Sequence, residues 1–112
     1  MKNYKNKGTV YLIEDIFNET YKIGVTRRKA ETRLKQLQTG NSNPLKLLAA
    51  YETEYPFRME SLLHNRFKLQ QANSEWFYLS KEDISTFIDT CKFYDNMIDV
   101  MKDNIYFAKN LH

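Results

Sequence analysis

Apolar and polar residues alternate in two short runs near the start of the chain, at residues 9–14 and 19–25. Both runs are rich in residues that favour strands, and a short polar connection with turn-forming residues separates them. This order predicts a β-hairpin. Because successive side chains of a strand point to opposite faces, Lys22 and Gly24 fall on the face opposite the apolar side of the second run (Tyr21, Ile23, Val25).

Helical spacing follows the hairpin. Residues 27–38 predict a helix with an apolar stripe that ends before Gly40 (Ala30, Leu34, Leu37). Residues 45–54 predict a third strand, although their Leu and Ala content is also compatible with a helix. Pro56 begins a second helix, which continues to about residue 70, because proline is well tolerated in the first turn. Residues 76–79 then predict a short buried strand or an extended packing segment.

The last third of the chain shows a heptad pattern. Ser80 and Asp83 have the spacing of a capping box, which predicts a helix start. Apolar residues then recur at alternating steps of three and four (Ile84, Phe87, Cys91, Tyr94, Ile98, Met101, Ile105, Ala108). We therefore expect one long amphipathic helix over residues 81–112, packed on a core domain formed by residues 1–80 or forming a homodimer seam.

Composition excludes several classes of protein. The 112 residues include 7 Phe, 8 Tyr and 1 Trp, too many aromatic side chains for a disordered chain. No apolar run approaches the roughly 20 residues of a membrane span, and no apolar segment follows the basic N-terminus as in a secretory signal. A single cysteine, Cys91, excludes an internal disulfide or a multi-cysteine zinc site. We expect one globular domain in an intracellular, reducing setting.

The net charge of +3 is unevenly distributed. Residues 1–80 carry 13 Lys and Arg against 8 Asp and Glu, a net charge of +5, whereas residues 81–112 carry 4 against 6, a net charge of −2. The first part of the chain is therefore suited to contact a polyanion.

The ordered motifs of residues 8–80 resemble the GIY-YIG nuclease superfamily. Thr9-Val10-Tyr11, preceded by Gly8, stands where that family has Gly-Ile-Tyr, and Lys22-Ile23-Gly24 stands where it has Tyr-Ile-Gly. "RLKQLQTGN", "MESLLHNRF" and "SEWFYL" are similar to the short phage and viral branch with a Lys-Ile-Gly motif. The resemblance implies an α+β fold with a small three-stranded sheet flanked by helices.

The resemblance also implies roles for single residues. Tyr11 would lie near the scissile phosphate as proton acceptor or water positioner, and Arg33 would neutralise that phosphate. Glu60 would hold a single Mg²⁺ or Mn²⁺ ion. Lys22 would take the place of the second motif's tyrosine, and Gly24 would let the backbone approach the phosphate. The family's later asparagine has two candidate counterparts, Asn73 and Asn65.

These residue types suit phosphodiester hydrolysis. A divalent ion held by one carboxylate and several waters is a Lewis acid, and an arginine fork matches the geometry of a phosphate. A tyrosine has a pKa near 10, so it needs nearby cations to act as a base. We expect Lys22 and Arg33 to lower the pKa of Tyr11. His64, four residues after Glu60, would share its helix face and bind metal or relay a proton, or else hydrogen-bond to the "SEWF" segment.

Other residues extend the predicted site. Four basic residues form a solvated helix face that could grip backbone phosphates (Arg27, Arg28, Lys29, Lys35). Glu75 is a candidate second acid near the metal, and the adjoining Trp76-Phe77 pair is a packing anchor or a base-stacking platform.

The sequence supports three functions. The first is a Mg²⁺-dependent endonuclease that makes single-strand breaks in DNA. The second is a catalytically inactive DNA-binding module on the same scaffold, and the third is an oligomerising interaction protein that uses the long helix. Convergence of Tyr11, Arg33 and Glu60 on one surface would favour the first over the second.

Overall fold

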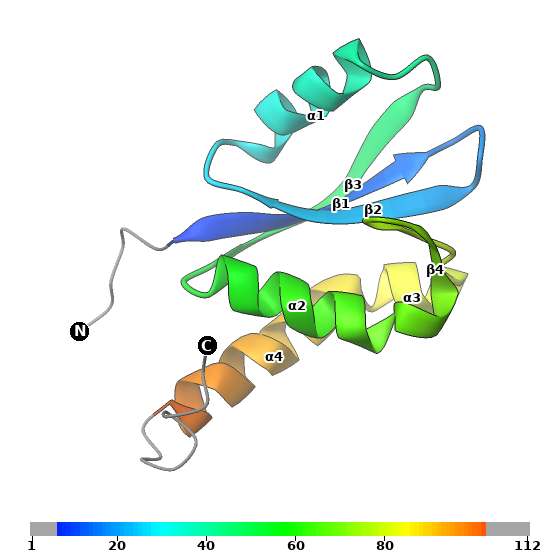
Figure 1. The fold of residues 1–112 in the computed structure, drawn as a ribbon. Coiled ribbons are helices and arrows are strands. Elements are labelled where there is room, and N and C mark those ends of the chain that lie inside the picture. The colour runs from blue at the N-terminus through cyan, green and yellow to red at the C-terminus, as the bar shows by residue number, and fades with distance from the viewer. Residues whose placement is uncertain (1–6, 103–112) are drawn as a thin grey trace.

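A five-stranded antiparallel sheet forms the centre of the computed structural model, which describes residues 7–102. Helix α1 covers one face of the sheet, and α2, α3 and α4 lie on the other side (Figure 1). The strands are β1 (Gly8–Asp15), β2 (Thr20–Thr26), β3 (Leu45–Thr53), β4 (Gln71–Asn73) and β5 (Trp76–Phe77). The helices are α1 (Ala30–Thr39), α2 (Pro56–Arg66), α3 (Lys81–Ser85) and α4 (Phe87–Met101), with a 3₁₀ turn at Lys68–Gln70.

The α+β class is confirmed, but the prediction of a three-stranded sheet is wrong. The sheet has the order β3-β1-β2-β5-β4, in which β4 and β5 form a small ribbon beside β2. Residues 76–79 were expected to include a short buried strand, and β5 is that strand. β4 and β5 are only three and two residues long, too short for alternation to mark them as sheet strands.

The predicted hairpin is confirmed, and its register brings key residues together. β1 and β2 pair so that Tyr11 lies opposite Gly24 and Ile13 lies opposite Lys22. Because directly opposed residues of a strand pair point to the same face, these four side-chain positions share the face covered by α1. Ile23 points to the other face, into the larger core.

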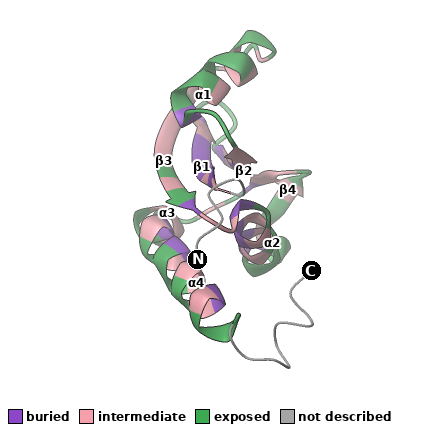
Figure 2. Cartoon of the chain, turned by 90° about the vertical axis from the view of Figure 1, so that its left-hand side faces the viewer, coloured by how far each residue is buried: buried purple, intermediate pink, exposed green. Residues whose placement is uncertain are grey.

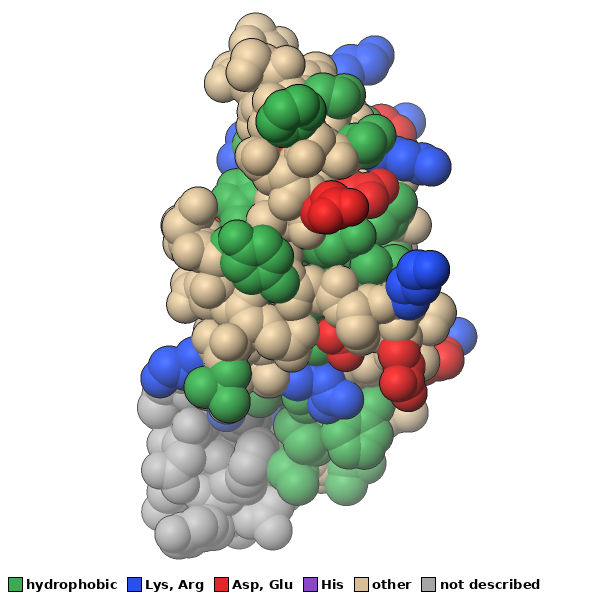
Figure 3. Space-filling view, turned by 90° about the vertical axis from the view of Figure 1, so that its right-hand side faces the viewer, with side chains coloured by type: hydrophobic (Ala, Val, Ile, Leu, Met, Phe, Trp, Pro, Cys, Tyr) green, Lys and Arg blue, Asp and Glu red, His purple; other side chains and the backbone are tan. Residues whose placement is uncertain are grey.

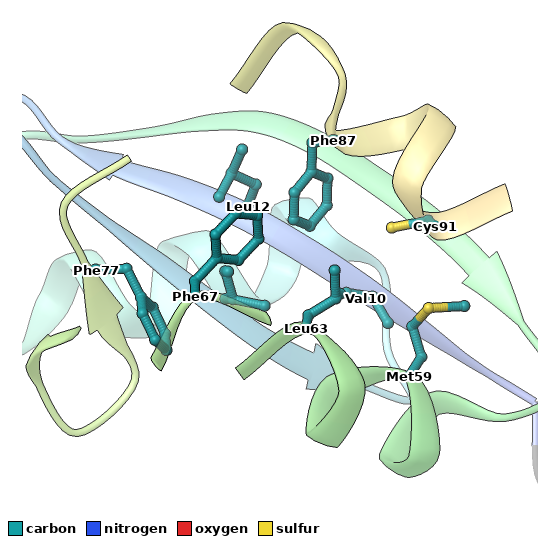
Figure 4. Close-up of a cluster of buried hydrophobic side chains, with 9 residues drawn as sticks. Val10, Leu12, Met59, Leu63, Phe67, Phe77, Phe87 and Cys91 are labelled. Atoms are coloured by element: carbon teal, nitrogen blue, oxygen red, sulfur yellow. The ribbon is translucent and has the colours of Figure 1, made fainter. Parts of the chain in front are cut away.

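Two clusters of buried side chains hold the layers together. The larger one lies between the sheet, α2 and α4, and its side chains point toward one another (Figure 4). It contains Val10, Leu12, Ile23, Met59, Leu63, Phe67, Phe77, Phe87 and Cys91. The smaller cluster joins β1 to α1 and contains Tyr11, Ile13 and Ala30. Figure 2 shows the same division, with buried residues on β1 and on the inward sides of α2 and α4.

The expected single C-terminal helix is divided at Thr86. This residue has a φ of −100° and a ψ of 7°, and its hydroxyl donates to the carbonyl of Glu82 at 2.7 Å, so the chain turns between α3 and α4. The predicted capping box of Ser80 and Asp83 is present. Ile105 and the residues after it lie outside the described residues.

The heptad face of α4 packs on the chain's own core. Phe87, Cys91 and Ile98 are buried, whereas Phe93 and Val100 on the same helix are exposed. The homodimer through residues 81–112 stays a prediction. Across residues 7–102, no helix has the length and apolar character that crossing a membrane requires.

Asp15 fastens the turn of the hairpin to the loop between α1 and β3. Its side chain is buried and accepts hydrogen bonds of 3.0–3.1 Å from four donors: the backbone N–H groups of Phe17 and Asn18, and the side-chain amides of Asn18 and Asn43. Burial raises the pKa of Asp15, but these hydrogen bonds outweigh it and hold the pKa below its ordinary value of 3.8.

Replacing Asp15 with asparagine is expected to destabilise the fold by about 1–3 kcal/mol at pH 7, because buried donors lose a charged acceptor. The pKa of Asp15 is lowered by folding, so its stabilisation is present above about pH 4 and is lost as the pH falls through the folded value. Thermal unfolding from pH 7 to pH 3 should therefore show a difference between wild type and variant that shrinks in acid. Asp89→Asn, at an exposed position, is the control; an equal loss there would contradict the assignment.

Candidate functional site

The candidate site lies at the point along β2 where its pairing with β5 ends. β5 pairs with β2 only at Tyr21 and Lys22. At the next residue, the N–H of Ile23 donates to the carbonyl of Glu75 at 3.1 Å, and the carbonyl of Ile23 lies 2.8 Å from Nε2 of His64. Side chains from both sides of the sheet can therefore meet around this edge.

Three potential metal ligands converge here. One ligand atom from each of Glu60, His64 and Glu75 lies within 4.8 Å of the others, and all three residues are half-buried. Glu60 and His64 are one helical turn apart on α2, whereas Glu75 comes from the turn between β4 and β5. Sequence reasoning offered Glu75 only as a candidate second acid, because its proximity depends on the pairing of β5 with β2.

His64 is oriented by a backbone group. A carbonyl oxygen only accepts, so the contact with Ile23 requires Nε2 of His64 to carry a proton, and in the neutral imidazole Nδ1 then has the lone pair. This is the arrangement typical of metal-binding histidines. The hydrogen bond thus goes to β2 rather than to the "SEWF" segment, although the imidazole meets the ring of Phe77 edge-on at a centroid distance of 5.0 Å.

The two carboxylates repel each other. The pKa of Glu60 is raised above its ordinary value of 4.5, first by burial and then by the charge of Glu75, while His64 and Lys22 lower it. Beside them lies an open depression of about 360 Å³, lined by Glu60, Ser61, His64, Asn65, Lys68 and Gln71. Close carboxylates, an imidazole with a free lone pair and open access form a donor set that fits a divalent cation.

Lys22 already balances the negative charge of one of these carboxylates, Glu75. Its Nζ lies 3.2 Å from Oε1 of Glu75 and 5.8 Å from the ring centroid of Trp76, and its side chain is only 11% exposed. Lys22 therefore belongs to the site, as predicted from its position, but as the ion-pair partner of Glu75.

Tyr11 reaches the site across β2. Its side chain is buried and crosses the strand at Gly24, where an added Cβ would lie 2.6 Å from Cζ of the tyrosine and closer still to the hydroxyl oxygen. The reason for glycine at position 24 is thus the tyrosine ring, and the expected close approach of a phosphate to the backbone is not needed to explain it.

The hydroxyl of Tyr11 is surrounded by the other site residues. Burial raises its pKa above 10, a hydrogen bond and the positive charge of Arg33 lower it, and the charges of Glu75 and Glu60 raise it. The expectation that nearby cations lower this pKa overall is wrong, because burial and two carboxylates outweigh Arg33. Tyr11, Arg33 and Glu60 nevertheless converge, as the nuclease hypothesis requires.

The predicted DNA-binding residues are exposed, but most are not on a helix. α1 begins at Ala30, so Arg27, Arg28 and Lys29 lie on the connection from β2, and only Lys35 is on the helix. The guanidinium of Arg27 lies 5.6 Å from the ring centroid of Phe57. Their role in binding stays a prediction.

The two candidate asparagines lie in different places. Asn65 lines the depression beside Glu60 and His64. Asn73, the last residue of β4, lines a second pocket together with Trp76 and Tyr78. Neither side chain has a described hydrogen bond to Tyr11 or Arg33, so the asparagine of the GIY-YIG pattern stays unassigned.

Gly24→Ala is expected to destabilise the fold by about 1–3 kcal/mol and to abolish any activity that depends on Tyr11. The new methyl group overlaps the tyrosine ring, which has no room to retreat within the core. Chemical denaturation and a cleavage assay test this. Gly40→Ala is the matched control, because a Cβ there meets nothing closer than 4.0 Å. Equal behaviour of the two variants would show that Gly24 does not position Tyr11.

The comparisons with known proteins agree with a nuclease-like site at a coarse level. The T5orf172 domain matches residues 8–92, from the start of β1 into α4. It is a phage-type domain found in some nuclease-like proteins, and no match specific to the GIY-YIG superfamily accompanies it. Neither the curated proteins nor the solved structures gave a match. Over most of its length, and over every residue of the candidate site, the chain therefore belongs to the T5orf172 domain family.

Proposed function

We propose that this protein is a divalent-metal-dependent endonuclease that hydrolyses DNA phosphodiester bonds in the manner of the GIY-YIG enzymes. The observation that carries the proposal is the convergence of Tyr11 and Arg33 with the three potential metal ligands at one edge of β2. Burial and charge couple these groups, which come from four separate elements. A chance surface cluster would leave them exposed and independent.

Glu60, Glu75 and His64 are the residues that would hold Mg²⁺ or Mn²⁺. Such an ion, when bound, supplies a Lewis acid for the phosphate and lowers the pKa of a bound water. Burial and then the charge of Glu75 raise the pKa of Glu60, and a bound cation would relieve the repulsion between the two carboxylates.

Arg33 and Tyr11 act on the substrate. The planar guanidinium of Arg33 can donate two parallel hydrogen bonds to a phosphate as negative charge develops on it. The raised pKa keeps the hydroxyl of Tyr11 neutral at pH 7, so it would position the attacking water by accepting a hydrogen bond, and it could take a proton from that water only after losing its own to solvent. Glu60 and Glu75, which raise this pKa, are the same two carboxylates that a bound cation would neutralise. Metal binding would therefore make it easier for the Tyr11 hydroxyl to lose its proton and act as a base.

DNA is the proposed substrate because of the charge on the first part of the chain. Residues 1–80 carry a net charge of +5, and Arg28, Lys29 and Lys35 are exposed around α1. Contacts of this kind are made with phosphates and carry no base specificity. One site per chain predicts single-strand breaks with little intrinsic sequence preference, in an intracellular setting.

A DNA-binding module without catalysis is the second candidate. The ion pair between Lys22 and Glu75 favours it, because an ammonium group already occupies one carboxylate of the cluster. In that case the cluster would be a structural contact between β2 and the β4–β5 ribbon.

Nicking of supercoiled plasmid by the purified protein separates the two candidates. With Mg²⁺ or Mn²⁺ we expect conversion to open circles, and with EDTA none. A gel shift of the plasmid without nicking in either metal would favour the binding module. Neither nicking nor a shift would overturn both.

A further inference from the structure

A second pocket opens next to the candidate site. It has a volume of about 430 Å³ and lies between the β1–β2 turn, the α1–β3 loop and the β4–β5 ribbon. Its lining consists of Asp15, Asn18, Thr20, Asn41, Asn43, Ala72, Asn73, Trp76 and Tyr78. Figure 3 shows the side of the molecule that carries these segments, where backbone and uncharged polar side chains form most of the surface and charged and hydrophobic side chains are scattered among them.

The lining is polar but contains no lysine or arginine. Its one acid, Asp15, already accepts four hydrogen bonds. Its carboxylate therefore stabilises the wall of the pocket and is not available to a ligand. By contrast, the side-chain nitrogen of Asn41 and the whole side-chain amide of Asn73 make no hydrogen bond to the described part of the chain. Each amide therefore has donor capacity available to a ligand.

Aromatic rings complete the pocket. Trp76 is half-buried, and the side chain of Tyr78 is largely exposed. Trp76 also connects the pocket to the candidate site, because it pairs with Lys22 across the β2–β5 ladder and directly follows Glu75. A ligand in the pocket would therefore lie near the Lys22–Glu75 ion pair of the candidate site.

We propose that this pocket binds an unpaired nucleobase of the strand that the candidate site cleaves. The absence of cations from the lining excludes a phosphate as the favoured occupant, whereas amides match the edge of a base and aromatic rings match its face. The base must be single-stranded or turned out of the duplex to enter. The proposal names the substrate of the proposed function and rests on it, but base binding is measured without catalysis.

The test uses Trp76 as a reporter, since it is the chain's single tryptophan. In EDTA, a single-stranded dodecathymidylate is titrated against an abasic oligonucleotide of equal length and charge. We expect the dodecathymidylate to quench the tryptophan fluorescence and to bind about tenfold more tightly, the scale of stacking one base. Equal affinity and equal quenching, or no binding of either, would overturn the proposal.

Two variants test the lining directly. The double variant Asn41→Ala/Asn73→Ala and the single variant Tyr78→Ala should each weaken binding of the dodecathymidylate severalfold and leave binding of the abasic strand unchanged. Asn96→Ala and Phe93→Ala remove exposed side chains of the same types from α4 and are the controls. Equal effects in pocket and control variants would contradict the assignment.

Failure of this proposal is distinguishable from failure of the proposed function. Base-dependent quenching without any nicking in Mg²⁺ or Mn²⁺ would support the pocket and reject the nuclease. Nicking that shows no preference for strands that carry a base would support the nuclease and reject the pocket.

Discussion

Replacing Glu60 with glutamine is expected to lower metal-dependent nicking by about a thousandfold or more. Glu60 is the carboxylate that α2 contributes to the Glu60–His64–Glu75 cluster, and glutamine keeps its size while removing the charge that attracts a cation. Lewis-acid stabilisation by a metal is worth several kcal/mol, and each 1.36 kcal/mol is tenfold in rate. The nicking rate at saturating Mg²⁺ or Mn²⁺ measures the effect.

The same variant should be more stable than wild type without metal. The folded pKa of Glu60 is raised, so folding favours its protonated form. The stability that this provides is present below the ordinary value of 4.5 and is lost as the pH rises through the folded value. At pH 7 wild type therefore keeps a buried, repelled carboxylate that glutamine lacks. Thermal unfolding in EDTA should show a higher Tm for Glu60→Gln, and the difference should disappear near pH 4.

Glu82→Gln is the matched control for both measurements, since Glu82 is exposed on α3. Calorimetric titration with Mn²⁺ adds a readout that is independent of cleavage. Retained nicking and retained Mn²⁺ binding in Glu60→Gln would show that the metal site is misassigned. A Tm in EDTA below that of wild type would show that Glu60 instead makes a stabilising contact.

Arg33→Ala is expected to reduce the turnover number by about 10²–10³-fold, the effect of removing one donor from a developing anion. Arg33 is half-buried beside the hydroxyl of Tyr11, so its charge acts in a partly desolvated site. Its loss also removes a group that lowers the pKa of Tyr11 by a hydrogen bond and by its charge. If Tyr11 accepts the proton, the rise of the rate with pH should move to higher pH in the variant.

Arg28→Ala provides the contrast, because it removes the same charge from an exposed position. We expect it to weaken DNA binding evenly across sequences and to reduce the salt dependence of affinity by about one unit of slope. Its turnover number should stay unchanged. An effect of Arg33→Ala below threefold on turnover, or a pattern identical to that of Arg28→Ala, would remove Arg33 from the active site.

Local patterns were sufficient to predict the hairpin and the third strand. β1 and β2 are rich in strand-forming residues, and their pairing follows from adjacency along the chain. The proximity of Glu60 and His64 was predictable for the same reason, because helical spacing is a local property. The role of Pro56 as the first residue of α2 is likewise confirmed.

Contacts that depend on long-range pairing were not predictable. Glu75 joins Glu60 only because β5 pairs with β2, and that ladder involves just two residues of β5. Periodicity could not reveal the break at Thr86, because the heptad spacing runs through it. The pKa of Tyr11 depends on how far the sheet and α1 bury its hydroxyl, which composition and spacing do not report.

The short ladder between β2 and β5 also means that the candidate site is complete only while the β4–β5 ribbon stays paired with β2. The ribbon that carries Glu75 is held by that short ladder, by the bond between Ile23 and Glu75, and by the ion pair to Lys22. Opening it would expose Phe77, which is fully buried in the larger cluster, so the packing of this ring also opposes the opening. Glu60 and Glu75 would hold a divalent ion together only while the ribbon is in place, so binding of the ion would shift the population toward that form. Metal occupancy and the order of this ribbon would then rise and fall together.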